Sequence, residues 1–262
     1  MSKFMEDNLN VPLSNVLEII QKRQLSHSTY FGVPAQKSPT DFWVYQEIIY
    51  ETKPDVILEI GVRKGGSVFA FAHLLDLLGK GRVIGIDISL GSVAGVVKNH
   101  PRITLMEGDA CKLFERVKSL IAPGEKVLII EDSSHTYENT LNVLRTYSVL
   151  IQNGGYFIVE DGICHHGIKM GPNPGPYEAI EVFVRENPDF EIDRSKEDFL
   201  ITWNPKGYLK RRSIDFENSG TKYGKIPFMK RVGKLTADEF FRLLIPPVIY
   251  IIVEKLKSSA NS

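Results

Sequence analysis

Two apolar segments in the middle of the sequence end in carboxylates. Glu160 and Asp161 directly follow residues 156–159, and Asp132 follows the apolar part of "KVLIIEDSSH". Adjacent like charges at the end of an apolar strand repel each other and resist desolvation, so a cation should compensate them. Carboxylate oxygens favour a hard divalent ion such as Mg2+, whereas no cysteine or histidine pair has the spacing of a zinc site. We therefore expect Asp132, Glu160 and Asp161 to hold Mg2+.

A histidine lies close to this acidic group in the sequence. His135 is three residues beyond Asp132, at the start of an expected helix. An unperturbed histidine titrates near neutrality and can take a proton from a hydroxyl, which a bound metal ion would acidify. We expect His135 to act as a general base, with Asp132 as its catalytic partner through the metal. The alternative for His135 is a helix cap or an exposed side chain.

The stretch "LEIGVRKGGS" forms a glycine-rich turn after an apolar segment. Gly61, Gly65 and Gly66 let the backbone approach a ligand, and the next helix offers free N–H groups at its start. The spacing is neither GxGxxG nor that of a P-loop, because Lys64 precedes the glycine pair. A site for a dinucleotide pyrophosphate is therefore disfavoured.

Three more carboxylates accompany expected strands. Glu59 lies within the first strand, Asp87 ends the second in "VIGID", and Asp109 follows the third in "EGDA". A carboxylate at the end of the second strand, such as Asp87, commonly accepts hydrogen bonds from both ribose hydroxyls of a nucleotide. A carboxylate inside a strand, such as Glu59, needs a hydrogen-bond donor beside it. A ligand with a ribose and an amino group but no pyrophosphate fits better than NAD, and S-adenosylmethionine is such a ligand. The alternative is that all three cap backbone N–H groups.

The elements that must position these residues alternate between strand-like and helix-like patterns. Continuous apolar runs at 55–62, 82–89, 126–133 and 155–162, separated by helical stretches, indicate a parallel sheet covered on both faces. Residues 190–195 and 199–205 read as a closing β-hairpin. We predict a doubly wound α/β fold with an antiparallel end, in which Asp132 and Glu160 meet at one edge of the sheet.

The composition of the chain bears on its binding partners and on its location in the cell. The 262 residues carry 32 basic and 32 acidic side chains, so no overall positive field favours nucleic acid. Two cysteines cannot form a disulfide framework, and the N-terminus lacks a signal-peptide pattern, so we expect a cytoplasmic protein. The apolar C-terminal stretch 240–257 is too short to span a bilayer. It is expected to pack on the core or on a second copy, with peripheral membrane contact as the alternative.

Several stretches together resemble a known family. "YFGVPAQKSPTDFWVYQEIIYETKPDVILEIGVRKGGS", "IIEDSSHTYENTLNVLRTY", "GGYFIVEDG" and "NPGPYEAI" are similar to the cephalosporin hydroxylases and rhamnosyl O-methyltransferases, and to Mg-dependent sugar O-methyltransferases of macrolide biosynthesis. The resemblance runs from about Tyr30 to Arg211. It implies a seven-stranded class I methyltransferase fold, Mg2+ at Asp132, Glu160 and Asp161, and a base at His135. The implied methyl-donor site consists of Glu59, Gly61, Ser67, Asp87 and Asp109, beside the glycine turn that contains Gly65.

These observations lead to one expected function and two alternatives. We expect an S-adenosylmethionine- and Mg2+-dependent O-methyltransferase acting on a hydroxyl of a sugar, glycolipid or polyketide glycoside. The alternatives are hydroxylation or methoxylation of a β-lactam, and a non-catalytic partner that binds the nucleotide. We expect each chain to consist of an N-terminal cap (1–45), a methyltransferase domain (46–212) and a C-terminal extension (213–262). We also expect the protein to form a homo-oligomer.

Overall fold

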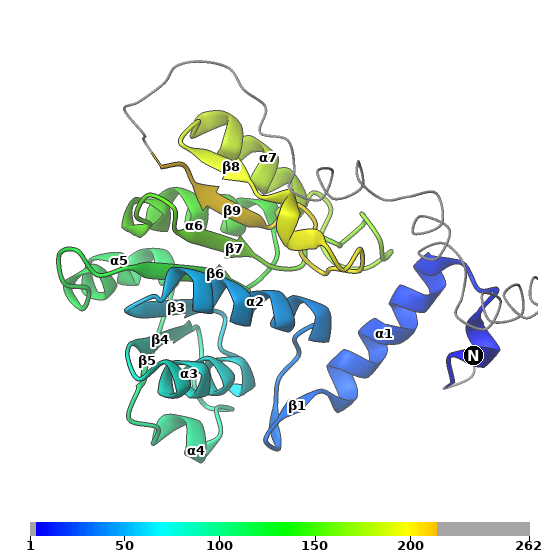
Figure 1. Ribbon diagram of the computed structural model, residues 1–262, viewed down its shortest axis with the longest axis horizontal. Helices are drawn as coiled ribbons and strands as arrows, with labels where there is room; N and C mark the ends of the chain where they lie inside the picture. The colour runs from blue at the N-terminus through cyan, green and yellow to red at the C-terminus, as the bar shows by residue number, and fades with distance from the viewer. Residues whose placement is uncertain (1–3, 214–262) are drawn as a thin grey trace, which may run out of the picture. The chain divides into compact units, whose positions relative to one another are not determined.

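A seven-stranded sheet forms the centre of the computed structural model, which describes residues 4–213 (Figure 1). Its strand order is β5-β4-β3-β6-β7-β9-β8, in which β5 to β7 are parallel and β9 runs antiparallel to both of its neighbours. The strands are β3 (Val56–Ile60), β4 (Arg82–Asp87), β5 (Ile103–Glu107), β6 (Val127–Glu131), β7 (Tyr156–Val159), β8 (Phe190–Ile192) and β9 (Tyr208–Arg211). The predicted doubly wound fold with an antiparallel end is confirmed.

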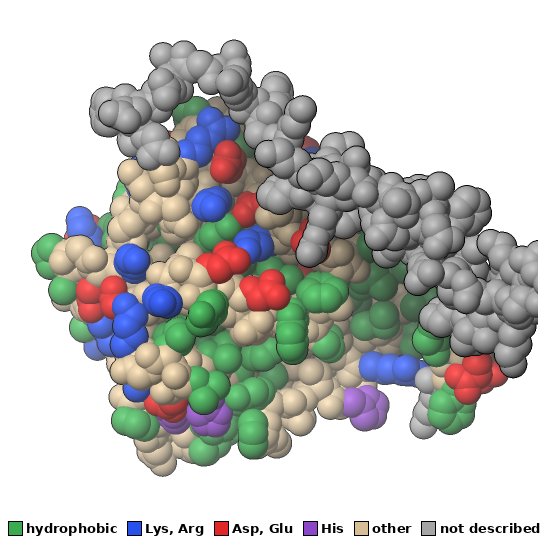
Figure 2. Space-filling model, viewed as in Figure 1, with side chains coloured by type: hydrophobic (Ala, Val, Ile, Leu, Met, Phe, Trp, Pro, Cys, Tyr) green, Lys and Arg blue, Asp and Glu red, His purple; other side chains and the backbone are tan. Residues whose placement is uncertain are grey.

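Helices cover both faces of this sheet, as its continuous apolar strands require. One hydrophobic cluster joins the sheet to α5, α6 and α7, and a second joins the other face to α2, α3 and α4. The helices are α1 (Leu13–His27), α2 (Pro39–Thr52), α3 (Gly66–Leu78), α4 (Gly95–Lys98), α5 (Ala110–Ser119), α6 (Tyr137–Tyr147) and α7 (Pro176–Glu186), with 3-10 turns at Glu6–Asn8, Ser148–Leu150 and Arg194–Glu197. In the view of Figure 2, hydrophobic side chains gather over α2 and α3.

The pairing of the central strands decides which carboxylates meet. Glu131 on β6 pairs with Val159 on β7, so the next residues along, Asp132 and Glu160, are also side by side. Glu59 on β3 pairs with Ile130 on β6. Because side chains alternate along a strand, the side chains of Ile130 and Asp132 lie on the same face of the sheet. All three carboxylates therefore point to the face that α2 and α3 cover.

The segment before the sheet is a helix followed by a small hairpin and a second helix. Strands β1 (Thr29–Tyr30) and β2 (Val33–Pro34) form the hairpin, and Ser38 caps α2 by accepting the Asp41 N–H at 3.5 Å. The predicted domain boundary at residue 45 falls within α2. The predicted C-terminal extension, including its apolar stretch, lies outside the described residues. Among the residues the structure describes, no helix is both long and apolar enough to cross a membrane.

The prediction of a strand at residues 199–205 is wrong. The strand that pairs with β8 is β9, which begins only at Tyr208. Two residues of the predicted strand instead bind the buried carboxylate of Asp41 in α2. Thr202 Oγ1 donates a hydrogen bond to this carboxylate at 2.5 Å, and the Trp203 N–H donates another at 2.7 Å. Burial raises the pKa of Asp41, although these hydrogen bonds oppose the shift. The Trp203 N–H that Asp41 accepts is therefore not available to pair with a neighbouring strand.

Candidate active site

A cavity of about 670 Å³ opens at the carboxyl ends of β3, β4, β5 and β6. Residues from the loops after these strands line it, together with residues of α1 and the segment that follows β2. The size suits a small-molecule ligand. The predicted site residues that line the cavity are Gly61, Ser67, Asp87, Asp109, Asp132, His135 and Asp161, whereas Glu59, Gly65 and Glu160 lie behind its wall.

The glycine turn after β3 brings the ends of β3 and β6 into contact. Gly61 has a φ of +99°, and a Cβ there would lie 2.0 Å from the carbonyl oxygen of Asp132. Only glycine allows this approach. Gly65 has a φ of +91° and is the N-cap of α3, where a Cβ would meet the side chain of Val97 at 2.9 Å. Gly61 thus shapes the cavity beside Asp132, whereas Gly65 serves the turn and its packing.

Glu59 is a fully buried carboxylate inside β3. It accepts a hydrogen bond from Ser67 Oγ at 2.8 Å and forms an ion pair with Lys37 Nζ at 3.0 Å. Burial raises its pKa, and the charge of Lys37 opposes this shift. Glu59 does not line the cavity, but both of its partners do. Its donors are therefore protein groups, which fix Ser67 and Lys37 in the wall.

Asp87 and Asp109 both cap backbone groups and face the cavity. The two carboxylate oxygens of Asp87 accept the N–H groups of Arg63 at 2.7 Å and Ser89 at 3.0 Å. Asp109 is the N-cap of α5 and accepts the Lys112 N–H at 3.1 Å. Capping and ligand contact are therefore compatible here, because each carboxylate retains lone pairs that face the cavity.

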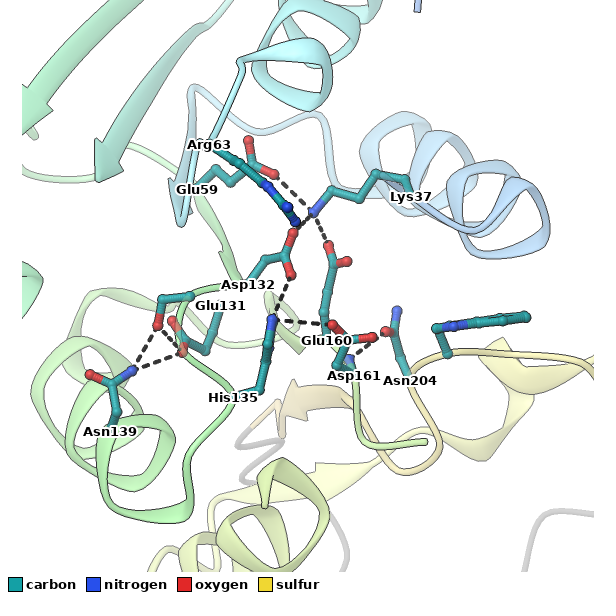
Figure 3. Close-up of polar contacts among 12 residues, drawn as sticks. Lys37, Glu59, Arg63, Glu131, Asp132, His135, Asn139, Glu160, Asp161 and Asn204 are labelled. Carbon is teal, nitrogen blue, oxygen red and sulfur yellow. Dashed lines mark hydrogen bonds and ion pairs between the residues drawn. The ribbon is translucent and has the colours of Figure 1, made fainter. Parts of the chain in front are cut away.

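The inner half of the acidic site surrounds a lysine (Figure 3). Lys37 Nζ forms ion pairs with Asp132 Oδ2, with Glu160 Oε1 at 2.5 Å and with Glu59. Burial and the charge of Asp132 raise the pKa of Glu160 well above its usual value, although Lys37 opposes the shift. The expected metal ion left Lys37 without a role in compensating these charges. In the sequence Lys37 is a single lysine just before the helix start "SPTDF", in a segment expected to cover the cleft.

The outer half of the acidic site faces the cavity and contains His135. Its Nε2 lies 3.2 Å from Asp161 Oδ2 and 3.8 Å from Asp132 Oδ1. Asp161 has a φ of +58°, which costs a residue with a side chain about 1–2 kcal/mol. Asn204 supports this backbone by accepting the Asp161 N–H at 3.3 Å, and it donates to Tyr45 Oη at 2.6 Å. Sequence reasoning missed Asn204.

Asp132 belongs to both halves of this site. The donor atoms of Asp132, His135 and Asp161 lie within 4.8 Å of one another, and so do those of Glu59, Asp132 and Glu160. The predicted trio of Asp132, Glu160 and Asp161 is thus divided between two adjacent groups that share Asp132. Together the two halves contain four carboxylates and one ammonium group, a formal net charge of −3 when His135 is neutral. Oxygen donors with excess negative charge fit a hard divalent ion.

A second buried carboxylate lies beside Asp132 on the other face of the sheet. Glu131 accepts hydrogen bonds from Ser133 Oγ at 2.6 Å and Asn139 Nδ2 at 3.3 Å, and both donors line the cavity. Its Oε2 is buried without a hydrogen-bond partner among the described residues. Burial raises the pKa of Glu131 to about 7. This network supports the cavity floor, and sequence reasoning did not identify it.

The chain is similar to known proteins over most of its length. Residues 22–212 match the family model described as Rhamnosyl O-methyltransferase/CmcI. Rhamnosyl O-methyltransferases of Mycobacterium tuberculosis and Mycobacterium leprae are each 34% identical over 193 residues, covering 70% and 71% of this chain and 78% and 83% of theirs. Among solved structures, CmcI with Mg and SAM has a TM-score of 0.59 at 26% identity, over 72% of this chain and 78% of that chain.

A further solved structure extends the same likeness. CmcI in its apo form matches with a TM-score of 0.57 at 28% identity, over 72% of this chain and 77% of that one. The family match, over residues 22–212, includes both halves of the acidic site. The chain belongs to the Rhamnosyl O-methyltransferase/CmcI family and is an S-adenosylmethionine-dependent O-methyltransferase.

Proposed function

We propose that this chain transfers the methyl group of S-adenosylmethionine to a hydroxyl of a sugar or glycosylated acceptor, with Mg2+ bound at the acidic site. The observation that carries the proposal is the convergence of Asp132, Asp161 and His135 at the wall of one cavity. A relative described as a rhamnosyl O-methyltransferase supports the sugar class.

The methyl donor is proposed to lie along the turns after β3, β4 and β5. Asp87 would accept the ribose hydroxyls, and Asp109 would lie near the adenine. Gly61 and Ser67 would contact the methionine end, where Gly61 leaves room for close approach. Glu59 would act through Ser67, whose hydroxyl it holds at 2.8 Å.

Asp132, Glu160 and Asp161 are the proposed ligands of Mg2+. When bound, Mg2+ supplies a Lewis acid that lowers the pKa of a coordinated hydroxyl and holds it in place. Burial raises the pKa of the Glu160 and Asp161 carboxyls, although Lys37 and His135 oppose the shift. A divalent ion would relieve this cost.

His135 is the proposed general base. Its Nε2 points toward the carboxylates of Asp161 and Asp132, where an acceptor hydroxyl would lie. The hydroxyl proton would pass to Nε2, and Asp161 would stabilise the resulting imidazolium at 3.2 Å. The oxygen would then displace the sulfonium in line, a step that depends mainly on positioning.

The experiment that tests this function measures methyl transfer to a panel of rhamnosides and other deoxysugar glycosides. Transfer should require added Mg2+ and stop in EDTA. A protein that binds S-adenosylhomocysteine but methylates no member of the panel, with or without Mg2+, would contradict the proposed sugar acceptor. The homo-oligomer, the cytoplasmic location and the membrane contact of the C-terminal stretch stay predictions.

A further inference from the structure

Lys37 places a fixed positive charge within the acidic site. The side chain is 6% exposed and comes from the segment between β2 and α2, far from its partners in sequence. Burial alone would lower its pKa, but the charges of Asp132, Glu160 and Glu59 together raise the pKa well above its usual value. Three carboxylates around Nζ favour the charged ammonium form of Lys37.

This cation occupies carboxylate oxygens that a metal ion would also use. Asp132 and Glu160 each direct an oxygen to Lys37 Nζ, and both are proposed Mg2+ ligands. The donor atoms of these two residues and Glu59 lie within 4.8 Å of one another, which suits a single central cation. Two cations at such short range would repel each other strongly, so they compete.

We propose that Lys37 is a positioning residue whose ammonium group holds the place of a cation between Asp132 and Glu160, and that Mg2+ displaces it toward Glu59. The inference rests on the proposed function, because it takes Asp132 and Glu160 as metal ligands. Glu59 is suited to receive the displaced group, since its Oε1 is already 3.0 Å from Nζ and faces no cavity. This also explains why a glutamate lies inside β3, where an unpaired carboxylate is costly.

Displacement of Lys37 by Mg2+ would also affect the wall of the cavity. Pro34, Ala35 and Gln36 directly precede Lys37 and line the same cavity. A Cβ on Gly66 would lie 2.4 Å from the Pro34 carbonyl oxygen, so this segment packs closely against the start of α3. A shift of Lys37 therefore links occupancy of the metal site to the wall of the cavity.

The test is the Mg2+ affinity of metal-stripped Lys37→Met protein, measured by isothermal titration calorimetry. Competition predicts that Lys37→Met binds Mg2+ at least about tenfold more tightly than the native chain, a change of about 1.4 kcal/mol. Unchanged or weaker binding would overturn the inference, because a lysine that merely orders the metal ligands should help binding. Lys98→Met is the matched control, since Lys98 is exposed at the end of α4 and should leave the affinity unchanged.

A second pair of variants protects the test against loss of folding. Lys37→Met leaves three carboxylates without their ammonium partner, whereas Lys37→Met with Glu59→Gln keeps the net charge of the native site. The double variant should bind Mg2+ more tightly than Glu59→Gln alone, with circular dichroism confirming the fold. If the native chain binds Mg2+ but either comparison, made on folded variants, shows no tightening, the inference fails and the proposed function stands. If the native chain does not bind Mg2+, the metal assignment itself fails.

Discussion

Lys37 and Asp132 form an ion pair across 95 positions of the chain, and the other carboxylate oxygen of Asp132 lies 3.8 Å from His135 Nε2. Asp132 therefore connects a buried group, around Lys37, with a group that faces the cavity. Its two oxygens have different partners, so one side chain couples the charge of the buried half to the position of the proposed base.

Asp132→Asn should abolish methyl transfer while leaving nucleotide binding close to that of the native chain. The amide keeps the shape but removes the charge that Mg2+ and Lys37 share. Because loss of an outer partner of a metal site already costs about 10–100-fold, loss of a ligand should cost at least about 100-fold in kcat. Turnover and S-adenosylhomocysteine titrations measure the two effects. Asp198→Asn, at an exposed carboxylate, is the control. Native turnover in Asp132→Asn would exclude Asp132 as a ligand.

His135→Gln should lower kcat by about 10²–10⁴-fold, the usual contribution of a positioned general base. The pH–rate profile of the variant should differ from that of the native chain, because a different group must then take the proton. The KM for S-adenosylmethionine should not change, because His135 is not among the residues proposed to bind the donor. A pH–rate profile of the variant that matches the native profile would show that another group takes the proton.

Asp87→Asn should weaken binding of S-adenosylhomocysteine by about 10–100-fold, because a hydrogen bond to a charged group contributes about 1.5–3 kcal/mol. The amide oxygen can still accept one of the two backbone N–H groups that Asp87 now holds. Calorimetry measures the affinity, and circular dichroism checks that the turn survives. An unchanged affinity would place the ribose elsewhere in the cavity.

Glu131→Gln should change how stability depends on pH. The folded pKa of about 7 lies above the unfolded value near 4.5, so the native chain loses stability as pH rises from about 4.5 to 7. The variant lacks this loss, which amounts to about 3 kcal/mol at most. Relative to the native chain, Glu131→Gln should therefore gain stability between pH 5 and pH 8 in urea unfolding. A difference that is independent of pH would contradict the assignment.

Gly61→Ala should destabilise the fold by about 3 kcal/mol or more, because the new Cβ would lie 2.0 Å from the Asp132 carbonyl oxygen. Gly124→Ala is a matched control, since Gly124 also has a positive φ, +86°, but open space around its Cβ position. The control should cost only about 1–2 kcal/mol. Equal losses in thermal or urea unfolding would mean that backbone strain, and not the contact with Asp132, decides the effect.

The sequence predicted the sheet and most of the acidic site because strand periodicity carries that information. Asp132 and Glu160 each follow a continuous apolar run, and neighbouring parallel strands bring such ends together. The sequence could not show that Glu160 turns inward to Lys37 while Asp161 turns toward His135. That division depends on the left-handed backbone of Asp161, which Asn204 supports from a distant loop.

The residues that sequence reasoning missed act through long-range contacts. Lys37 meets Glu160 across 123 positions, and no periodicity connects them. The prediction of a strand at 199–205 failed for the same reason. Its apolar residues favour a strand locally, but hydrogen bonds to Asp41 hold Thr202 and Trp203 in a loop. Tertiary hydrogen bonds to a buried carboxylate outweighed the local β-propensity.

The most direct measurement of the central claim is the rate of methyl transfer from S-adenosylmethionine to a rhamnoside by metal-stripped protein, titrated with Mg2+. We predict that transfer is absent in EDTA, returns with added Mg2+, and does not return in Asp161→Asn. Full turnover without any divalent ion, or Mg2+ rescue that is unaffected by Asp161→Asn, would contradict the account.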